Sequence, residues 1–356
     1  MTQEKQGEIL GSGGTVSGGA GLGAAVAFES GPELGEIAQI RARGYWESVW
    51  LRLKRDKLAL ASAVFIVFLF LAAFAGAPLA ARWLGHGPTD IFIGSEAITA
   101  DLVPAGPWTH VTDPITGEKT LFVLGASDRL GRDEFLRLLY GAQVSLEVAV
   151  LSTISVMFIG VLLGAIAGYF RGWIDTIISR VTEITMAFPA LLFIIALAAT
   201  VGPRLDTITL GIFGKGVVTL LIVFSLFGWF YPCRIMRAQV LSIREKEYIE
   251  AARMVGASDL RIIRSHVIPH LLAPIIVFST LIVASYVLSE AGLSFLGLGI
   301  KTPTASWGNL LSSAPEFYTA QPWLMVWPGL AVLLTTLAFN LLGDGLRDAF
   351  DPRGSR

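Results

Sequence analysis

Few residues of this sequence have the type and the setting that binding or catalysis in an apolar environment would require. The clearest is Glu290, a carboxylate at the end of a long apolar stretch. An unpaired charge is costly in hydrocarbon, so such a residue either has a function or is held by partners. Two roles stay open for Glu290, contact with a ligand and structural support between helices, and its place near a helix end favours support.

Other reactive residues do not form a recognisable site. His266 and His270 stand four residues apart, but Pro269 lies between them and no Glu-x-x-His pair accompanies them, so their spacing does not indicate zinc. Cys233 is the only cysteine, which excludes an intrachain disulfide and a multi-cysteine metal site. The only Gly-Lys pair is not followed by Ser or Thr, so there is no phosphate-binding P-loop. The sequence predicts no catalytic residue, no metal ligand and no cofactor on this chain.

The composition indicates a lipid environment. Hydrophobic residues make up 53% and charged residues 15% of the 356 residues, and the mean hydropathy is +0.64. Soluble domains average roughly 45–50% and about 25%, respectively. The 27 Lys and Arg are balanced by 28 Asp and Glu, so the chain lacks the basic excess of a nucleic-acid-binding protein. We therefore expect membrane lipid, and no nucleic acid, as a partner.

Six apolar runs are long enough, or nearly so, to cross a bilayer as helices. They are Leu58–Ala81, Val148–Tyr169, Ile184–Pro203, Gly216–Cys233, Leu271–Ser289 and Pro322–Leu342. The predicted fold is therefore an all-α integral membrane protein with six transmembrane helices and a structured loop between the first two. Gly160, Gly164 and Gly168 recur at every fourth position of the second run, which favours close helix packing over a substrate path.

The loop charges predict the orientation. Most of the 27 Lys and Arg fall on the side of both termini, the side that basic residues mark as cytoplasmic. The predicted organisation is a flexible Gly-rich cytoplasmic tail (1–40), an interfacial segment and first membrane helix (41–81), an extracytoplasmic loop (82–143), a core of five membrane helices (144–346) with a long inner loop (about 242–270), and a cytoplasmic C-terminal tail (347–356).

The first outer loop contains two predicted elements. Trp108–Thr112 and Thr120–Leu124 favour strands, and the turn residues Asp113–Gly117 between them predict a hairpin. The spacing of apolar residues in Asp133–Ala142 predicts a short amphipathic helix at the outer membrane surface.

The inner loop holds the most unusual segment, Glu247–Pro269. It is predicted to form two short helices separated at Gly256, which can adopt a positive φ. Ser258 or Asp259 is expected to cap the second helix, and Pro269 to end it. Its apolar face is predicted to consist of Leu260, Ile263 and Val267. By periodicity alone, an amphipathic connector that rests on the membrane fits equally well.

This segment resembles the EAA signature of permease subunits of ABC importers, in which a helix-turn-helix docks into a groove on the cytoplasmic ATPase. The residues that match, at the spacing of that motif, are Glu250, Ala251, Ala252, Gly256 and Pro269. His266 and Ile268 depart from it, since many such loops have Ile and Leu there. The resemblance implies these ATPase-coupling residues: Glu250, Ala251, Ala252, Gly256, Ala257, Ser258, Asp259, Arg261 and Pro269.

Further segments resemble permeases of the OppC/DppC type, which transport dipeptides and oligopeptides. Before the second membrane helix, the matching residues are Asp128, Gly131, Arg132 and Asp133, which the resemblance places on the side of the binding protein. Two more matches are Glu290–Gly299 and Gly343–Arg353. Glu290 thereby becomes a candidate for the gate or the translocation path.

The resemblance also implies the surroundings of the chain. It implies a bacterial inner membrane protein that forms a heterodimer with a second homologous permease, two cytoplasmic ABC ATPase subunits that bind ATP and Mg²⁺, and an extracytoplasmic substrate-binding protein. Peptide import by alternating access is the expected function. The same architecture could import a nickel chelate, glutathione or another small solute. A membrane enzyme would need a polar cluster that the spans lack, and the inner helix-turn-helix has no evident purpose in a membrane scaffold.

Overall fold

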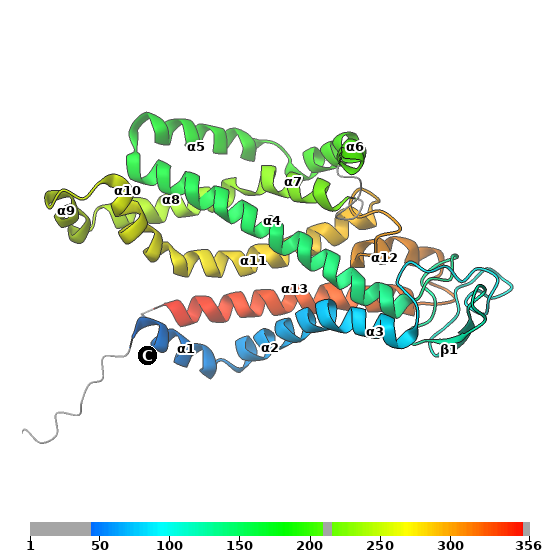
Figure 1. Cartoon of the computed structure of the whole chain (residues 1–356). Coiled ribbons are helices and arrows are strands. Elements are labelled where there is room, and N and C mark those ends of the chain that lie inside the picture. The colour runs from blue at the N-terminus through cyan, green and yellow to red at the C-terminus, as the bar shows by residue number, and fades with distance from the viewer. Residues whose placement is uncertain (1–43, 209–215, 352–356) are drawn as a thin grey trace, which may run out of the picture. The chain divides into compact units, whose positions relative to one another are not determined.

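The computed structural model describes residues 44–208 and 216–351, and the predicted N-terminal tail lies outside these residues. Helices dominate, with one two-stranded sheet among the described residues (Figure 1). The elements are α1 Tyr45–Arg55, α2 Lys57–Leu71, η2 Ala72–Gly76, α3 Ala77–Leu84, β1 Thr109–Thr112, β2 Lys119–Phe122, α4 Glu134–Phe170, α5 Gly172–Ala187, α6 Ala190–Ile208, α7 Val217–Gly228, α8 Phe230–Arg244, α9 Glu247–Met254, α10 Asp259–Ile262, η3 Ile263–Val267, α11 Ile268–Phe295, α12 Trp307–Ser313, η4 Ala314–Glu316 and α13 Trp323–Phe350.

Among the described residues, five continuous helical stretches are long and apolar enough to cross a membrane, and a sixth candidate is broken. The five are Lys57–Leu84, Glu134–Phe170, Val217–Arg244, Asp259–Phe295 and Trp323–Phe350. The prediction of an all-α membrane protein is confirmed, with five or six spans.

The continuous helix predicted over Ile184–Pro203 is wrong. Gly172–Ala187 and Leu191–Leu205 meet at an angle of 85°. Phe188 has φ −79° and ψ 138°, the extended conformation that the residue before a proline prefers, and Pro189 supplies no amide hydrogen. The chain therefore turns between α5 and α6.

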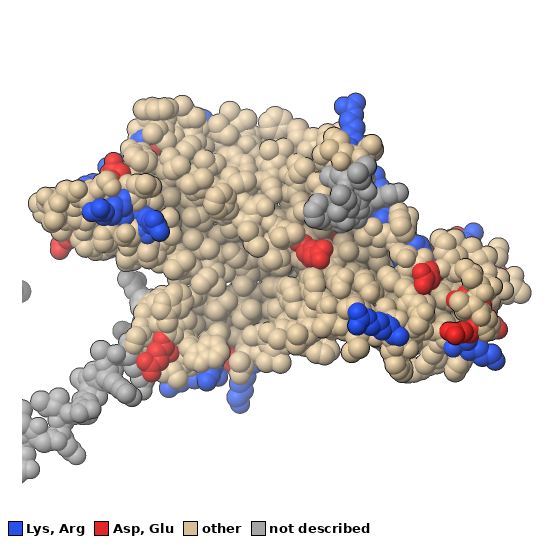
Figure 2. All heavy atoms as spheres, viewed as in Figure 1, with Lys and Arg blue, Asp and Glu red and all other residues tan. Residues whose placement is uncertain are grey.

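The distribution of charge fits a membrane protein. Figure 2 shows Lys, Arg, Asp and Glu gathered toward the two ends of the helix bundle, with few charged atoms on the surface between them. Many large apolar side chains on that surface are exposed, such as Phe68 (63%), Phe158 (69%) and Leu192 (64%). This exposure is favourable if lipid covers the surface.

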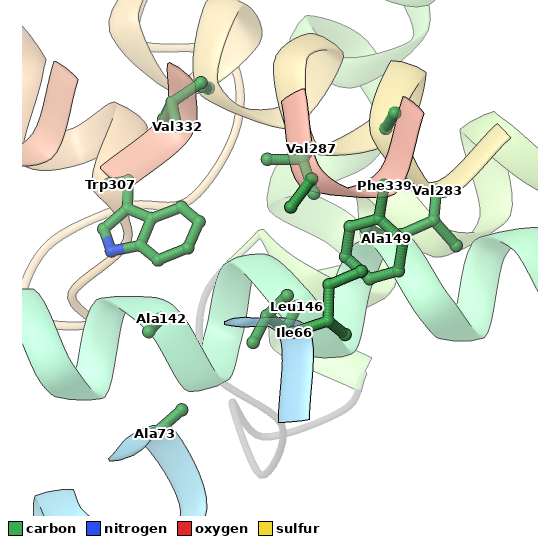
Figure 3. Close-up of a cluster of buried hydrophobic side chains, with 13 residues drawn as sticks. Ile66, Ala73, Ala142, Leu146, Ala149, Val283, Val287, Trp307, Val332 and Phe339 are labelled. Atoms are coloured by element: carbon green, nitrogen blue, oxygen red, sulfur yellow. The ribbon is translucent and has the colours of Figure 1, made fainter. Parts of the chain in front are cut away.

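The largest buried cluster joins α2, η2, α4, α11, α12 and α13 (Figure 3). Ile66, Leu146, Val287 and Phe339 come from four different helices of this cluster, and Trp307 of α12 closes it toward the hairpin end. The α4 and α11 helices that carry the candidate functional residues are therefore fixed by direct packing.

The close packing predicted for the glycine repeat of α4 is confirmed, and its partner is α8. A Cβ on Gly164 would lie 2.6 Å from the Cys233 carbonyl oxygen, and one on Gly168 would lie 2.8 Å from the Arg237 carbonyl oxygen. These distances leave no space for a side chain, so the two backbones touch.

The hairpin is confirmed as β1 and β2, paired antiparallel with Thr109 opposite Phe122. The separate amphipathic helix over Asp133–Ala142 is wrong, because these residues begin α4, which continues without a break to Phe170. Asp133 caps α4 by accepting from the Leu136 amide, and Gly141 lies against the backbone of α12. The cap at Asp133 and the packing against α12 thus extend α4 beyond its apolar run.

The C-terminal end of α13 lies beside α1, at the end of the bundle opposite the hairpin (Figure 1). Tyr45 stacks on Phe350, and Arg52 donates to the carbonyl oxygen of Asp351 at 2.6 Å. The predicted tail over 347–356 begins inside a helix, because α13 continues to Phe350.

Candidate functional site

The segment that resembles the EAA signature projects at the same end of the bundle as α1 (Figure 1). The α9 helix ends at Met254, and Gly256 adopts φ 85°, so the predicted break at this glycine is confirmed. A Cβ at Gly256 would meet no atom within 4 Å, so the position favours glycine for its conformation rather than for space.

Two details of the prediction for this segment are wrong. Pro269 does not end a helix, because α10, η3 and α11 form one stretch from Asp259 to Phe295. The π-helical turn Ile263–Val267 shifts the hydrogen-bond register just before this proline, which lacks an amide hydrogen. Leu260 is 75% exposed and does not share a buried face with Val267, which is fully buried together with Ile262.

The predicted side-chain cap of α10 is also wrong. Ser258 occupies the cap position but accepts no amide hydrogen through its hydroxyl. Asp259 instead accepts a hydrogen bond from the Tyr169 hydroxyl at 2.6 Å. Tyr169 lies near the C-terminal end of α4, so this carboxylate ties the segment to another membrane helix.

Tyr169 is an anchor that the sequence did not reveal. The Arg244 guanidinium at the end of α8 donates to the Tyr169 carbonyl oxygen, and Arg253 of α9 lies over its ring at 5.3 Å. Together with Asp259, these contacts connect α8, α9 and α10 to one residue of α4. A displacement of the segment would therefore be transmitted to α4 through Tyr169 as well as to α11 through the continuous helix.

The exposed surface of this segment carries large apolar side chains among charged ones. Met254 is 83% and Val255 is 89% exposed, and Leu260 and Ala251 are exposed too. The Glu250 carboxylate has no hydrogen-bond or ion-pair partner among the described residues. Met254 and Val255 did not stand out in the sequence, because single apolar residues in a short helix give no periodic signal.

Glu290 lies at the junction of α4, α11 and α12 and is completely buried. One carboxylate oxygen accepts from the Ser145 hydroxyl at 2.7 Å, and the other accepts from the Ser294 hydroxyl at 2.7 Å. These serines accept in turn from the amides of Trp307 (3.3 Å) and Ile300 (2.9 Å). The side chain is therefore held by partners within the chain, which favours the supporting role.

We expect Glu290→Leu to destabilise the α4–α11–α12 junction, because both serine hydroxyls lose their acceptor. A buried polar group without its partner costs about 1–3 kcal/mol. Glu290→Gln retains one acceptor oxygen and should stay closer to the native protein. Thermal unfolding and substrate uptake, measured on both variants, test this expectation. A Glu290→Leu variant with native stability but no uptake would instead indicate direct contact with the substrate.

The motif before α4 forms a turn that connects the loop with the hairpin to α4. Gly131 has φ 69°, and Arg132 donates through Nε to the Asp128 carboxylate at 2.7 Å. Asp133 both caps α4 and lies 3.1 Å from Nε2 of His86. Burial alone would lower the pKa of His86, but Asp133, the Leu84 carbonyl and the charge of Asp90 together outweigh it, so the pKa is raised above 6.5.

The predicted site residues therefore form three separate groups. The Glu247–Pro269 segment lies at one end of the bundle, the Asp128–Asp133 turn lies at the hairpin end, and Glu290 is buried beneath α12 toward the hairpin end. Both α4 and α11 run between the ends of the bundle and contact more than one of these groups.

Comparison with known proteins accounts for this arrangement. Residues 160–356 match the model of the binding-protein-dependent transport system inner membrane component. Residues 44–95 match the N-terminal TM domain of oligopeptide transport permease C. The chain belongs to this permease family. It is a multi-pass inner membrane subunit of an ABC transporter, is not itself an enzyme and carries no cofactor. The family also implies ATPase and binding-protein partners.

Two relatives match the permease over most of their length. It is 35% identical to the dipeptide transport system permease protein DppC of Alkalihalophilus pseudofirmus over 316 residues, 88% of this chain and 92% of the relative. It is 36% identical to the glutathione transport system permease protein GsiD of Escherichia coli O6:K15:H31 over 317 residues, with the same shares. A chain of the MetNI methionine ABC transporter in an inward-facing conformation matches at 18% identity and a TM-score of 0.48, over 61% of this chain and 97% of that one.

Proposed function

We propose that this permease translocates dipeptides or oligopeptides, delivered by a binding protein and driven by ATPases that dock on Glu247–Pro269. The observation that carries the docking assignment is the exposure of Met254 and Val255 beside Glu250, whose carboxylate has no partner within residues 44–208 and 216–351. Exposed apolar side chains beside a charge are suited to a protein interface, because they gain from burial while the charge sets the register.

The continuous helix from Asp259 to Phe295 supports transmission of the ATPase motion through the permease. Its first turn is held by Tyr169, and its far end carries Glu290. A helix of 37 residues is stiff compared with a loop, so displacement of its first turn moves the Glu290 junction. ATP binding and hydrolysis would then shift the balance between inward-facing and outward-facing states, since the docked ATPases contact these states differently.

We place the end that carries α1, α9 and the last turn of α13 in the cytoplasm, and the hairpin end outside. Two observations support this orientation: the Lys and Arg of the sequence favour the side of α1 and α9, and Figure 1 places these helices at one end. In this orientation both termini are cytoplasmic, residues 82–143 are extracytoplasmic, and Asp128, Gly131, Arg132 and Asp133 lie on the side of the binding protein.

The complete importer would contain a second homologous permease and two ATPase subunits, which bind the ATP and Mg²⁺. The substrate would pass between the two permeases. The exposed surface of this chain's described membrane helices is largely apolar, which suits contact with lipid better than passage of a polar substrate. The name of one relative specifies dipeptides and that of the other glutathione, so import of glutathione or another small solute is the second candidate. Peptide cargo is favoured because the N-terminal match is to an oligopeptide permease.

Uptake of a labelled dipeptide tests the cargo. Cells that lack this chain should lose uptake, and the wild-type gene should restore it. Unlabelled dipeptide should compete with the labelled substrate, whereas glutathione should not. Competition by glutathione alone would replace peptide by glutathione as the cargo, and unchanged uptake of both in the deleted cells would reject the proposed function.

A further inference from the structure

A cavity of about 200 Å³ lies at the hairpin end, between the turn that precedes α4 and the α12–η4 segment. Three arginines line it: Arg129 and Arg132 from the turn, and Arg137 from the second turn of α4. Asn309 and Ser313 line the opposite wall. None of these arginines has a role in the coupling segment or the Glu290 junction.

Two of the three arginines have a carboxylate partner within the chain. Arg132 donates to Asp128 through Nε and Nη2. At the mouth, Arg129 forms an ion pair with Glu316, and both side chains are at least half exposed. The positive charges of Arg129 and Arg132 are thus balanced by carboxylates that also line the cavity.

Arg137 is different. It is 1% exposed, and its single hydrogen bond within the described residues runs from Nη2 to the Asn309 side-chain oxygen at 3.2 Å. Its Nε and Nη1 atoms are buried and have no partner there. Glu134, one turn earlier, does not satisfy it, since no ion pair forms between them and Oε1 of Glu134 is also without a partner. A buried guanidinium with free donors strongly favours an anion at the cavity.

We propose that this cavity receives the carboxylate of an Asp or Glu side chain of the extracytoplasmic binding protein. This inference rests on the proposed function, which places the hairpin end outside. A carboxylate can accept from the donors of Arg137 that have no partner within the described residues, and this charge-assisted contact would fix the docked orientation. The volume favours a side chain over a peptide, because pockets that enclose small-molecule ligands measure about 300–1,000 Å³.

The first experiment tests the carboxylate chemistry without any partner protein. Acetate and chloride are compared at equal ionic strength on the purified full-length permease. Acetate should raise the melting temperature of the wild type by about 2 °C more than chloride, because it binds the folded state. Arg137→Gln keeps a polar side chain but lacks the charge and the guanidinium donors, so it should show no difference between the anions. Equal effects of both anions on the wild type, or an equal acetate effect on the variant, would overturn the proposal.

The second experiment measures docking of the purified binding protein on the assembled importer in nanodiscs. Arg137→Gln should weaken docking about 10- to 100-fold, as loss of a charge-assisted contact predicts. Arg82→Gln is the matched control, because Arg82 is an exposed arginine in the last turn of α3 and does not line the cavity, so its loss should change docking less than about threefold. Ser313→Glu would place a carboxylate in the cavity itself, and should weaken docking while it raises the melting temperature.

The two experiments distinguish a failure of the proposed function from a failure of this inference. If the wild-type importer binds no binding protein at all, the proposed function fails, whereas the acetate result still decides whether the cavity takes a carboxylate. If the acetate effect is present but Arg137→Gln docks as tightly as the wild type, the binding protein is not the source of the carboxylate and the proposal is rejected.

Discussion

Replacing Gly164 with leucine is expected to abolish correct folding of the permease. At this position α4 touches α8 through backbone atoms, and the new Cβ alone would lie 2.6 Å from the Cys233 carbonyl oxygen and 2.9 Å from the Met236 Cβ. Backbone cannot move aside as a flexible side chain can, so the two helices would have to separate. Overpacking in a close contact costs about 1–3 kcal/mol, and we expect the upper end of this range or more.

A matched glycine in another membrane helix provides the control. Gly292 lies in α11, is exposed, and a Cβ there would meet no atom within 4 Å. Gly292→Leu should therefore give native yields and a native melting temperature in detergent, and leucine even favours the helix. The comparison is made by size-exclusion chromatography and thermal unfolding of both variants. Equal loss in both variants, or native behaviour of Gly164→Leu, would contradict the close contact between α4 and α8.

The Gly164 contact shows what the sequence does reveal about this fold. Glycines at every fourth position of an apolar run predict a close helix contact, although not which helix is the partner. Apolar length predicted the spans, but not their ends. The first turns of α4 carry Glu134 and Arg137, which hydropathy excludes from a membrane helix. They are helical because the loop before α4 and the α12 helix cover them. Such tertiary contacts have no local signal in the sequence.

For the candidate sites too, local features were predicted from the sequence and long-range contacts were not. The break at Gly256 follows from the conformational freedom of glycine, and it was predicted from one residue. The partners of Asp259 and Glu290 were not predictable, because Tyr169 and Ser145 are distant in sequence. The prediction that a helix ends at Pro269 was wrong because the π-helical turn before it accommodates a proline that would end a regular helix. Sequence spacing thus located the segments, whereas long-range contacts determine what each side chain does.

The second large effect is expected at Val255, at the tip of the proposed ATPase-docking segment. This side chain is 89% exposed, so Val255→Asp should leave the fold of the permease unchanged. In the docked complex, however, the new carboxylate would be buried in an apolar interface next to Met254 and without a partner. Burial of an unpaired charge is strongly unfavourable, and interface residues of this kind cost at least about 2 kcal/mol, or roughly 30-fold in affinity.

Co-purification of the ATPase with the tagged permease, together with peptide uptake, measures this effect. Val255→Asp should lose both, while membrane insertion and the melting temperature of the permease stay native. Ile115→Asp is the matched control, because Ile115 is 90% exposed and lies in the hairpin turn at the opposite end of the bundle. The same charge there should leave ATPase binding intact, since the proposed docking segment is on the other side of the membrane. Native ATPase recovery with Val255→Asp would show that α9 and its following turn do not form the docking surface. Loss of ATPase binding in both variants would mean that the effect of the added charge is not local.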